Sequence, residues 1–425
     1  MKNRVKTTIR LPQAIALYIG AVLGSGILIV PGLAAEIAGP ASLINWGFLM
    51  ILAIPLSMCM AYLSRDYSNA GGVSYFTKKA FGKLPGSLTG WLFLMSVPIG
   101  APVAALTGAG YVSAAFGLSE DIRTFLACII LLLAIILNYV GMSLVGKVQV
   151  AIVSGILGIL LLAFLGAVPN MNTEHFTPFI PHGTFSIMEA FTILFWCFVG
   201  WEAVSHLSEE FVHPEKDVMR ATLISAVLIG LTYFITAIAV VGTNSYQQDS
   251  QAALAIVTGQ AFGPIGAGLI GISSLLICLA TTITYIGAAS RLAGALSKDG
   301  NAPAWFRYTS EKYNTPLGGL AFLTFTFIIV ISLFALDIFS LTTFIKMANA
   351  SFLLTYMIGC ASGVILYKKE KKKQTICVIS FLATAFMLLF TGWSIMYPIS
   401  IILMVTISKR FTSPITFFYK KRIEK

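Results

Sequence analysis

The chain has 425 residues, of which 57% are apolar and only 11% are charged, and its formal net charge is +11. Soluble domains usually carry about 25% charged residues, so this chain has too few charges to cover an aqueous surface. These values exclude a soluble enzyme and predict an all-α integral membrane protein, with 1–425 forming a single polytopic membrane domain.

Apolar runs long enough to cross a bilayer recur along the whole sequence, since one helical crossing needs about 20 residues. We predict about 12 transmembrane helices, at 11–35, 41–63, 87–116, 124–145, 148–168, 186–208, 218–242, 264–290, 317–336, 339–366, 375–391 and 394–408. The last two runs are close to the lower length limit. An alternative joins them into one long helix, broken at Thr391 to Trp393.

The basic residues favour twelve crossings over eleven. With a cytoplasmic N-terminus, 26 of the 28 Lys and Arg residues fall on the cytoplasmic side, and the exceptions are Arg123 and Lys346. This asymmetry follows the positive-inside rule, so we expect both termini in the cytoplasm. The positive charge is then expected to face anionic lipid headgroups, and no nucleic-acid partner is predicted.

Six cysteines lie in apolar runs and form no CxxC pair. They are Cys59, Cys128, Cys197, Cys278, Cys360 and Cys377. We interpret them as small apolar residues, and predict neither disulfides nor a metal site. No cofactor is expected, although a proton or sodium gradient is an open possibility.

Two of the predicted spans are interrupted at mid-length. The first contains Leu23-Gly24-Ser25-Gly26-Ile27, and the sixth contains Trp196-Cys197-Phe198-Val199-Gly200-Trp201-Glu202. Glycine in a helix interior costs about 1 kcal/mol relative to alanine, so both places are candidate helix breaks. A break inside a membrane is tolerated only where it lines a protein or water cavity. The alternative for Gly24 to Gly26 is a small-residue packing face.

The two interruptions are five crossings apart and therefore run in opposite directions. Paired broken helices of opposite direction are typical of inverted-repeat transporters, which hold the substrate at the midplane. The N–H groups of a half-helix starting near Gly26 can hold a carboxylate, and Ser25 adds a hydroxyl. Carbonyls near Cys197, Phe198 and Val199 can accept from an ammonium group. Such a site suits a neutral amino acid, because it needs no charged side chain.

The sixth span adds aromatic side chains and one acid. Trp196, Phe198 and Trp201 can surround an apolar substrate side chain or simply pack. Glu202 is a candidate for proton coupling, because intramembrane acids are usually functional. Its alternative role is to hold the broken backbone of its own helix bundle. We interpret His206, one turn further on, as an ordinary interfacial histidine.

Lys346 lies about two turns into the tenth span. It either extends outward to the interface or faces the pathway, and we favour the first of these.

Several motifs resemble the amino acid–polyamine–organocation (APC) superfamily, in order over residues 10–310. They are Gly24-Ser25-Gly26-Ile27 with Pro31, Asn69 to Tyr75, Ala80-Phe81-Gly82, Phe198 to Glu202, Glu209 to Ala221, and Ser290 to Gly300. Within the superfamily, Phe195 to Gly200 followed by Glu202 and His206-Leu207 is similar to bacterial exporters of methionine and branched-chain amino acids.

That resemblance implies a five-plus-five inverted repeat with broken helices 1 and 6. The first repeat would be 11–168 (helices 1–5) and the second 186–366 (helices 6–10), with helices 11–12 at 375–408. It also implies a bacterial cell membrane and export of methionine, leucine, isoleucine or valine. Import or exchange by the same fold is the alternative.

The resemblance further assigns roles to individual residues. It implies carboxylate binding at Ser25 and Gly26, ammonium binding at the Trp196 to Val199 carbonyls, an aromatic gate at Trp196 and an eighth-helix aromatic at Tyr285. Several members carry a lysine in mid-fifth span, at a position where sodium sits in others, but 148–168 has none. Thr281 and Thr282 could offer oxygens to sodium, or bond to their own helix.

Three rival interpretations remain. A major facilitator fold should have a long loop between spans six and seven, whereas this loop is short. A membrane enzyme is disfavoured because the chain has no HExxH or Gly-x-Ser-x-Gly motif. A sensor that binds an amino acid without moving it is the third.

Overall fold

The fold is known from a computed structural model that describes residues 7–408. Residues 1–6 and 409–425 lie outside the described range. Both segments contain basic residues that we predict to be cytoplasmic. Within that range the chain is helical and has no strand; Ile9 and Phe211 form one isolated bridge.

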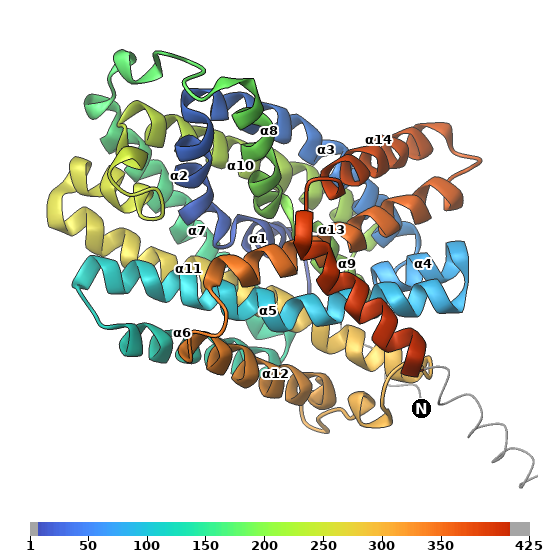
Figure 1. The fold of residues 1–425 in the computed structure, drawn as a ribbon. Coiled ribbons are helices and arrows are strands. Elements are labelled where there is room, and N and C mark those ends of the chain that lie inside the picture. Colours follow the sequence, from blue (N-terminus) through green and yellow to red (C-terminus); the bar gives the residue numbers. More distant parts are fainter. Residues whose placement is uncertain (1–6, 409–425) are drawn as a thin grey trace, which may run out of the picture.

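The α-helices follow one another along nearly the whole described chain (Figure 1). They are α1 Leu11–Leu23, α2 Gly26–Ala38, α3 Ser42–Asp66, α4 Val73–Phe81, α5 Lys83–Phe116, α6 Glu120–Val140, α7 Met142–Ala167, α8 Gly183–Leu194, α9 Trp201–Ser205, α10 Pro214–Gly242, α11 Ala253–Lys298, α12 Leu317–Ala335, α13 Leu341–Leu366 and α14 Lys371–Leu388. A last helical segment covers Gly392–Ser408.

The number of crossings agrees with the prediction. Nine helical segments of the described chain are long and apolar enough to cross a bilayer. One of them, Leu11–Asp66, has 56 residues, more than twice what one crossing needs, and the chain turns within it at Gly39, which has a φ of 61°. Lys371–Leu388 and Gly392–Ser408 are bent by 117° at their junction, so the second runs back. With this bent pair taken as one span the described chain has up to ten candidate spans; dividing both the pair and Leu11–Asp66 into two crossings gives the predicted twelve.

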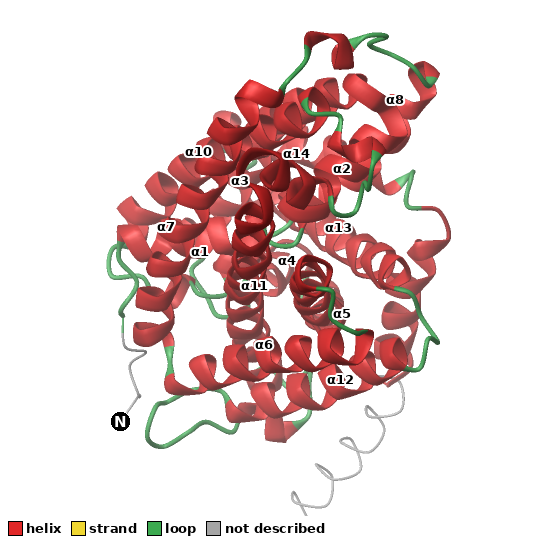
Figure 2. Cartoon of the chain, turned by 90° about the vertical axis from the view of Figure 1, so that its left-hand side faces the viewer, coloured by secondary structure: helices red, strands yellow, loops and turns green. Residues whose placement is uncertain are grey.

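Central and peripheral helices differ in burial. In the most apolar stretch of α5, 89% of the residues are buried, whereas the corresponding share is 28% for α6 and for α7. Figures 1 and 2 show α6 and α12 side by side along one edge. Their exposed leucine, isoleucine and phenylalanine side chains form a surface that suits lipid and not water.

Helices α5 and α11 pack closely against each other through small residues. The Ser274 hydroxyl of α11 donates to the Gly108 carbonyl of α5 over 2.8 Å. A Cβ at Gly108 would come within 2.8 Å of the Ser274 carbonyl oxygen, so glycine is needed for this approach. Small residues at helix contacts are typical of membrane bundles, where backbones approach closely.

The two interrupted spans are α1–α2 and α8–α9. Four crossings, α3, α5, α6 and α7, lie between them, so they pass through the bundle in opposite directions. α1 packs against α9, and α2 packs against α8 and α10. The two interruptions therefore meet inside the bundle. The division into repeats at 11–168 and 186–366, followed by 375–408, stays a prediction.

Candidate functional site

The first span is broken between Leu23 and Gly26. Gly24 has φ 37° and ψ −157°, a conformation that residues with a side chain rarely adopt. α2 then begins at Gly26, so the N–H groups of Gly26 and Ile27 have no carbonyl partner within the helix, whereas the Leu28 N–H donates to the Ser25 carbonyl over 3.2 Å. This end of a helix carries partial positive charge and favours an anion.

The carbonyl groups freed by the same break are bound by side chains. The Tyr233 hydroxyl of α10 lies 2.7 Å from the Leu23 carbonyl oxygen and 3.1 Å from that of Val22. The Thr281 hydroxyl of α11 donates to the Gly20 carbonyl over 2.8 Å. At this break the Gly26 backbone lies in the cavity lining. The carbonyl oxygens of Gly20, Val22 and Leu23 are already bound by the Thr281 and Tyr233 hydroxyl groups.

The second break follows a short 3-10 turn at Phe195–Phe198. Val199 is extended, Gly200 has a φ of 140°, and α9 starts at Trp201. A Cβ at Gly200 would lie 2.7 Å from Val22 Cγ2 and 2.9 Å from the Ala21 carbonyl carbon. Glycine is therefore required where the two breaks touch.

Glu202 is buried, with 0% of its surface exposed, and is bound on both oxygens. Its Oε2 accepts from the Gly200 N–H over 2.9 Å, and its Oε1 accepts from the Tyr285 hydroxyl over 3.2 Å. The Tyr356 hydroxyl of α13 accepts from the N–H groups of Gly200 and Glu202. The Glu202 carboxylate thus binds the backbone at the second break and also contacts Tyr285, which lines the cavity described next.

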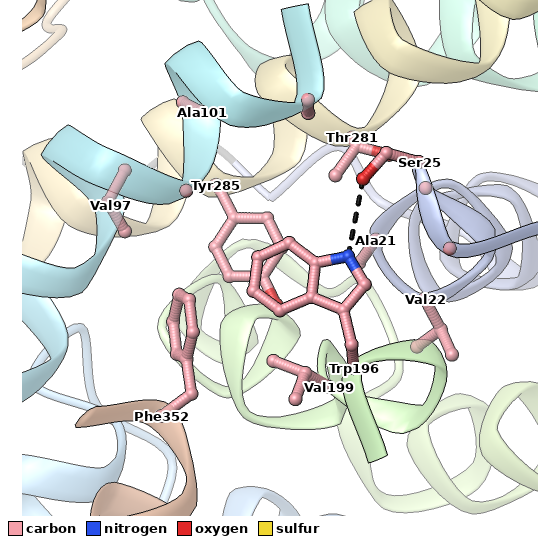
Figure 3. Close-up of a pocket in the computed structure, with 14 residues that line it drawn as sticks. Ala21, Val22, Ser25, Val97, Ala101, Trp196, Val199, Thr281, Tyr285 and Phe352 are labelled. Atoms are coloured by element: carbon pink, nitrogen blue, oxygen red, sulfur yellow. Dashed lines mark hydrogen bonds between the residues drawn. The ribbon is translucent and has the colours of Figure 1, made fainter. Parts of the chain in front are cut away.

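A cavity lies where the two breaks meet (Figure 3). The space inside it that a water molecule can reach is only about 30 Å³, so its own side chains nearly fill it in this conformation. Its lining is Ala21, Val22, Gly24, Ser25, Gly26, Val97, Gly100, Ala101, Ala104, Trp196, Val199, Thr281, Tyr285 and Phe352. None of these side chains is charged, so the lining offers apolar surface, hydroxyl groups, the Trp196 indole N–H and backbone polar groups.

The indole of Trp196 occupies the middle of this cavity. Figure 3 shows it between Ser25 on one side and the rings of Tyr285 and Phe352 on the other. Its Nε1 donates to the Ser25 hydroxyl over 3.3 Å. The indole therefore spans the gap between the two breaks and uses a hydroxyl group that a substrate would also reach.

The structure divides the predicted site residues into two groups. Those that line the cavity are Gly24, Ser25, Gly26, Trp196, Val199 and Tyr285. Those that do not are Leu23, Ile27, Cys197, Phe198 and Gly200, all of which are buried around the breaks.

Two aromatic side chains near the second break pack outside the cavity. The ring of Phe198, from the second group, packs on Tyr233 with centroids 5.7 Å apart, and Trp201 packs on Tyr18 at the same distance. Both contacts agree with the alternative that these aromatic side chains simply pack.

Seven lining residues were missed by sequence reasoning. Two are Ala21 and Val22 of α1, just before the first break; four are Val97, Gly100, Ala101 and Ala104 on one face of α5; the seventh is Phe352 of α13. The repeated small residues of the third span were a usable signal, although a packing face has the same pattern. Phe352 carried no such signal, because its position follows only from how α13 packs.

The threonines considered for sodium are engaged in hydrogen bonds. Thr281 bonds the Gly20 carbonyl and, over 3.2 Å, that of Ile277, while Thr282 bonds the Leu279 carbonyl in its own helix over 2.9 Å. Among residues 7–408, no group of three or more His, Cys, Asp or Glu side chains is placed to hold a metal ion.

Two other polar residues of the sequence analysis lie away from the lining. Lys346 is exposed on the surface of α13 and does not line the cavity. His206 is buried with 1% exposed, which corrects its interpretation as interfacial: it packs on Phe93, and its Nδ1 lies 3.1 Å from the Ala70 carbonyl oxygen.

Comparisons with known proteins agree with this architecture. A family model described as amino acid permease matches residues 9–419. The chain is 34% identical over 387 residues to the uncharacterized amino acid permease YecA of Bacillus subtilis, covering 91% of both chains. It is 30% identical over 401 residues to the L-methionine/branched-chain amino acid exporter YjeH of Escherichia coli, covering 92% of this chain and 94% of that one.

A more distant relative is the mouse large neutral amino acids transporter small subunit 2, 27% identical over 416 residues, which are 92% of this chain and 77% of that one. The match of the family model over nearly the whole chain and the identity to YecA and YjeH agree on one family. This chain is a multi-pass membrane protein that belongs to the amino acid permease family and is not an enzyme.

Proposed function

We propose that this permease is a secondary active transporter of neutral, hydrophobic amino acids: methionine, leucine, isoleucine and valine. It exports them by alternating access across a bacterial inner membrane, with both termini in the cytoplasm. The observation that carries the proposal is the open first turn of α2, which faces an apolar cavity without charged side chains. The relative YjeH, which bears the name of a methionine and branched-chain exporter, supports the same substrate class.

In this proposal the substrate binds mainly through backbone groups. Its carboxylate accepts from the N–H groups at Gly26 and from Ser25, and its ammonium group donates to carbonyls between Trp196 and Val199. Neither charge can be left unpaired in such an apolar place. The apolar side chain then lies against α5 and Phe352, and the Trp196 indole moves aside to admit it.

Glu202 is our candidate for proton coupling. It is the buried acid nearest the cavity, and the Tyr285 hydroxyl joins it to the lining. Intramembrane acids are expensive and usually serve a function. The alternative, a purely structural role at the second break, predicts a different result for the glutamine variant considered below.

Counterflow in proteoliposomes tests this function. Purified protein is reconstituted with unlabelled methionine inside, and entry of labelled methionine, leucine, lysine and glutamate is followed with and without proton and sodium gradients. We expect exchange of methionine and leucine and none of lysine or glutamate. Binding without flux would instead indicate a sensor, and net uptake without efflux would indicate an importer. Protein-free liposomes serve as the control.

A further inference from the structure

Three buried cysteines from distant parts of the chain meet outside the cavity. Cys59 of α3 and Cys377 of α14 are 318 residues apart in sequence, yet their sulfur atoms are 3.1 Å apart. Cys360 of α13 is the third, and its thiol also interacts with that of Cys59. Each is 0% exposed. Such proximity goes beyond the expectation that the cysteines act only as small apolar residues without disulfides.

The helix packing allows this contact at one glycine. A Cβ at Gly363 of α13 would lie 2.5 Å from Cys377 Sγ and 3.4 Å from Cys59 Sγ. Any larger residue would push the two sulfur atoms away, so Gly363 provides the space in which they meet. The third thiol, Cys360, lies one turn earlier on the same helix.

Charged groups lie within two turns of the thiols. Cys59 precedes Asp66 by seven residues, about 10 Å along the helix. Lys373 precedes Cys377 by four residues and so shares its helix face; its Nζ lies 2.8 Å from Asp66. In the orientation proposed above, this is the cytoplasmic end of the bundle.

We propose that Cys59 and Cys377 form a redox-sensitive pair that hydrogen peroxide converts to a disulfide. One thiolate attacks the peroxide, the O–O bond breaks, and a sulfenic acid and hydroxide form; a proton turns the hydroxide into water. The second sulfur atom then attacks the sulfenic sulfur, the S–O bond breaks, and a second water leaves. The two thiols lose two electrons and the peroxide gains them. A dithiol reductant reverses the reaction.

The disulfide would restrain moving parts of the transporter. α3 packs against α8, α9 and α10, next to the second break, and α14 packs against both α3 and α13. Phe352 of α13 lines the cavity. Alternating access needs one group of helices to move against another. A covalent link between α3 and α14 therefore slows flux, a consequence that rests on the proposed function. Cytosolic disulfides are typically transient and redox-sensing, which suits such a switch.

Mass spectrometry of the full-length protein in proteoliposomes tests the pair directly. The sample is treated with hydrogen peroxide, free thiols are alkylated in denaturant, and peptides are mapped. We expect a Cys59–Cys377 crosslinked peptide that disappears with dithiothreitol and is absent from Cys59→Ser and Cys377→Ser. Cys128→Ser is the matched control, because Cys128 is an exposed cysteine of α6, and it should retain the crosslink. Methionine flux should fall severalfold on oxidation, recover on reduction, and stay unchanged in Cys59→Ser.

Two results would overturn the proposal. In the first, Cys59 and Cys377 both remain alkylated under conditions that oxidise Cys128. In the second, Cys59 pairs with Cys360 instead. A disulfide that forms without slowing flux would contradict its restraining role. If the reduced wild-type protein moved no amino acid at all, the proposed transport function would be wrong. Peptide mapping would still show whether Cys59 and Cys377 form a disulfide.

Discussion

Gly26 is a residue of the candidate site at which one added methyl group should impair transport. A Cβ there would lie 2.8 Å from the Tyr233 hydroxyl and 2.9 Å from Cys197 Sγ, so it would push the two breaks apart. Overpacking of this kind costs about 1–3 kcal/mol. We expect Gly26→Ala to weaken methionine transport by about tenfold or more, because 1.4 kcal/mol corresponds to tenfold in affinity. Counterflow measures the loss.

The control for this change is another glycine in a membrane helix. A Cβ at Gly158 of α7 would meet nothing within 4 Å, so Gly158→Ala should transport like the wild type. Membrane levels and gel-filtration profiles of both variants are compared first. Equal flux in Gly26→Ala and Gly158→Ala would contradict the assigned site.

The variant Glu202→Gln distinguishes a role of Glu202 in proton coupling from a purely structural role at the second break. The amide keeps an oxygen for the Gly200 N–H but cannot carry a proton on and off. If Glu202 is the coupling group, the variant keeps exchange close to the wild-type rate and loses about tenfold or more of the flux driven by a proton gradient. Parallel exchange and gradient assays on the same vesicles give the answer.

Tyr285→Phe is the companion variant. It removes the hydroxyl that joins Glu202 to the cavity while leaving the acid in place. Loss of exchange and gradient-driven flux together in Glu202→Gln would favour the structural role of the acid at the second break.

At the scale of elements, the first break depends on a hydroxyl from α10. Tyr233→Phe removes the bonds to the Val22 and Leu23 carbonyls and leaves both buried without that donor. Unsatisfied buried groups cost about 1–3 kcal/mol, so the apparent Tm in detergent should fall. Tyr308 is 68% exposed, and Tyr308→Phe should leave the Tm unchanged. A Tm for Tyr233→Phe equal to that of Tyr308→Phe would argue against this support.

The contact between α5 and α13 should set the size of the accepted side chain. A Cβ at Gly100 would lie 3.4 Å from the ring of Phe352 and reduce the cavity on that side. One methylene group in an apolar pocket changes discrimination by about 10–200-fold. Gly100→Ala should therefore shift preference from methionine towards valine, and Phe352→Ala should admit phenylalanine. Competition for labelled leucine uptake measures both, and an unchanged rank order in both variants would contradict this assignment.

At the scale of the whole molecule, patterns within single helices could be predicted from the sequence. The breaks at Gly24 and Gly200 could be predicted because glycine destabilises a continuous helix, so glycine in the middle of a span indicates a candidate break. The twelve crossings follow from apolar length and from the basic residues between them.

Contacts between distant helices could not be predicted in the same way. Tyr356 bonds the backbone of Gly200 across 156 residues, and Cys59 meets Cys377 across 318. No periodicity within one helix encodes such pairs, because they depend on how separate helices pack. The same holds for Phe352 in the cavity and for the burial of His206.

An experimental structure with L-methionine bound tests the central claim most directly, namely that bare backbone groups at two broken helices hold the substrate's charged ends. We predict that the carboxylate lies within hydrogen-bond distance of the Gly26 N–H and the Ser25 hydroxyl. The ammonium group should face the carbonyls of Trp196 to Val199, and the Trp196 indole should have left the cavity. Uninterrupted helix through Gly24 and Gly200, or methionine bound elsewhere, would contradict the account.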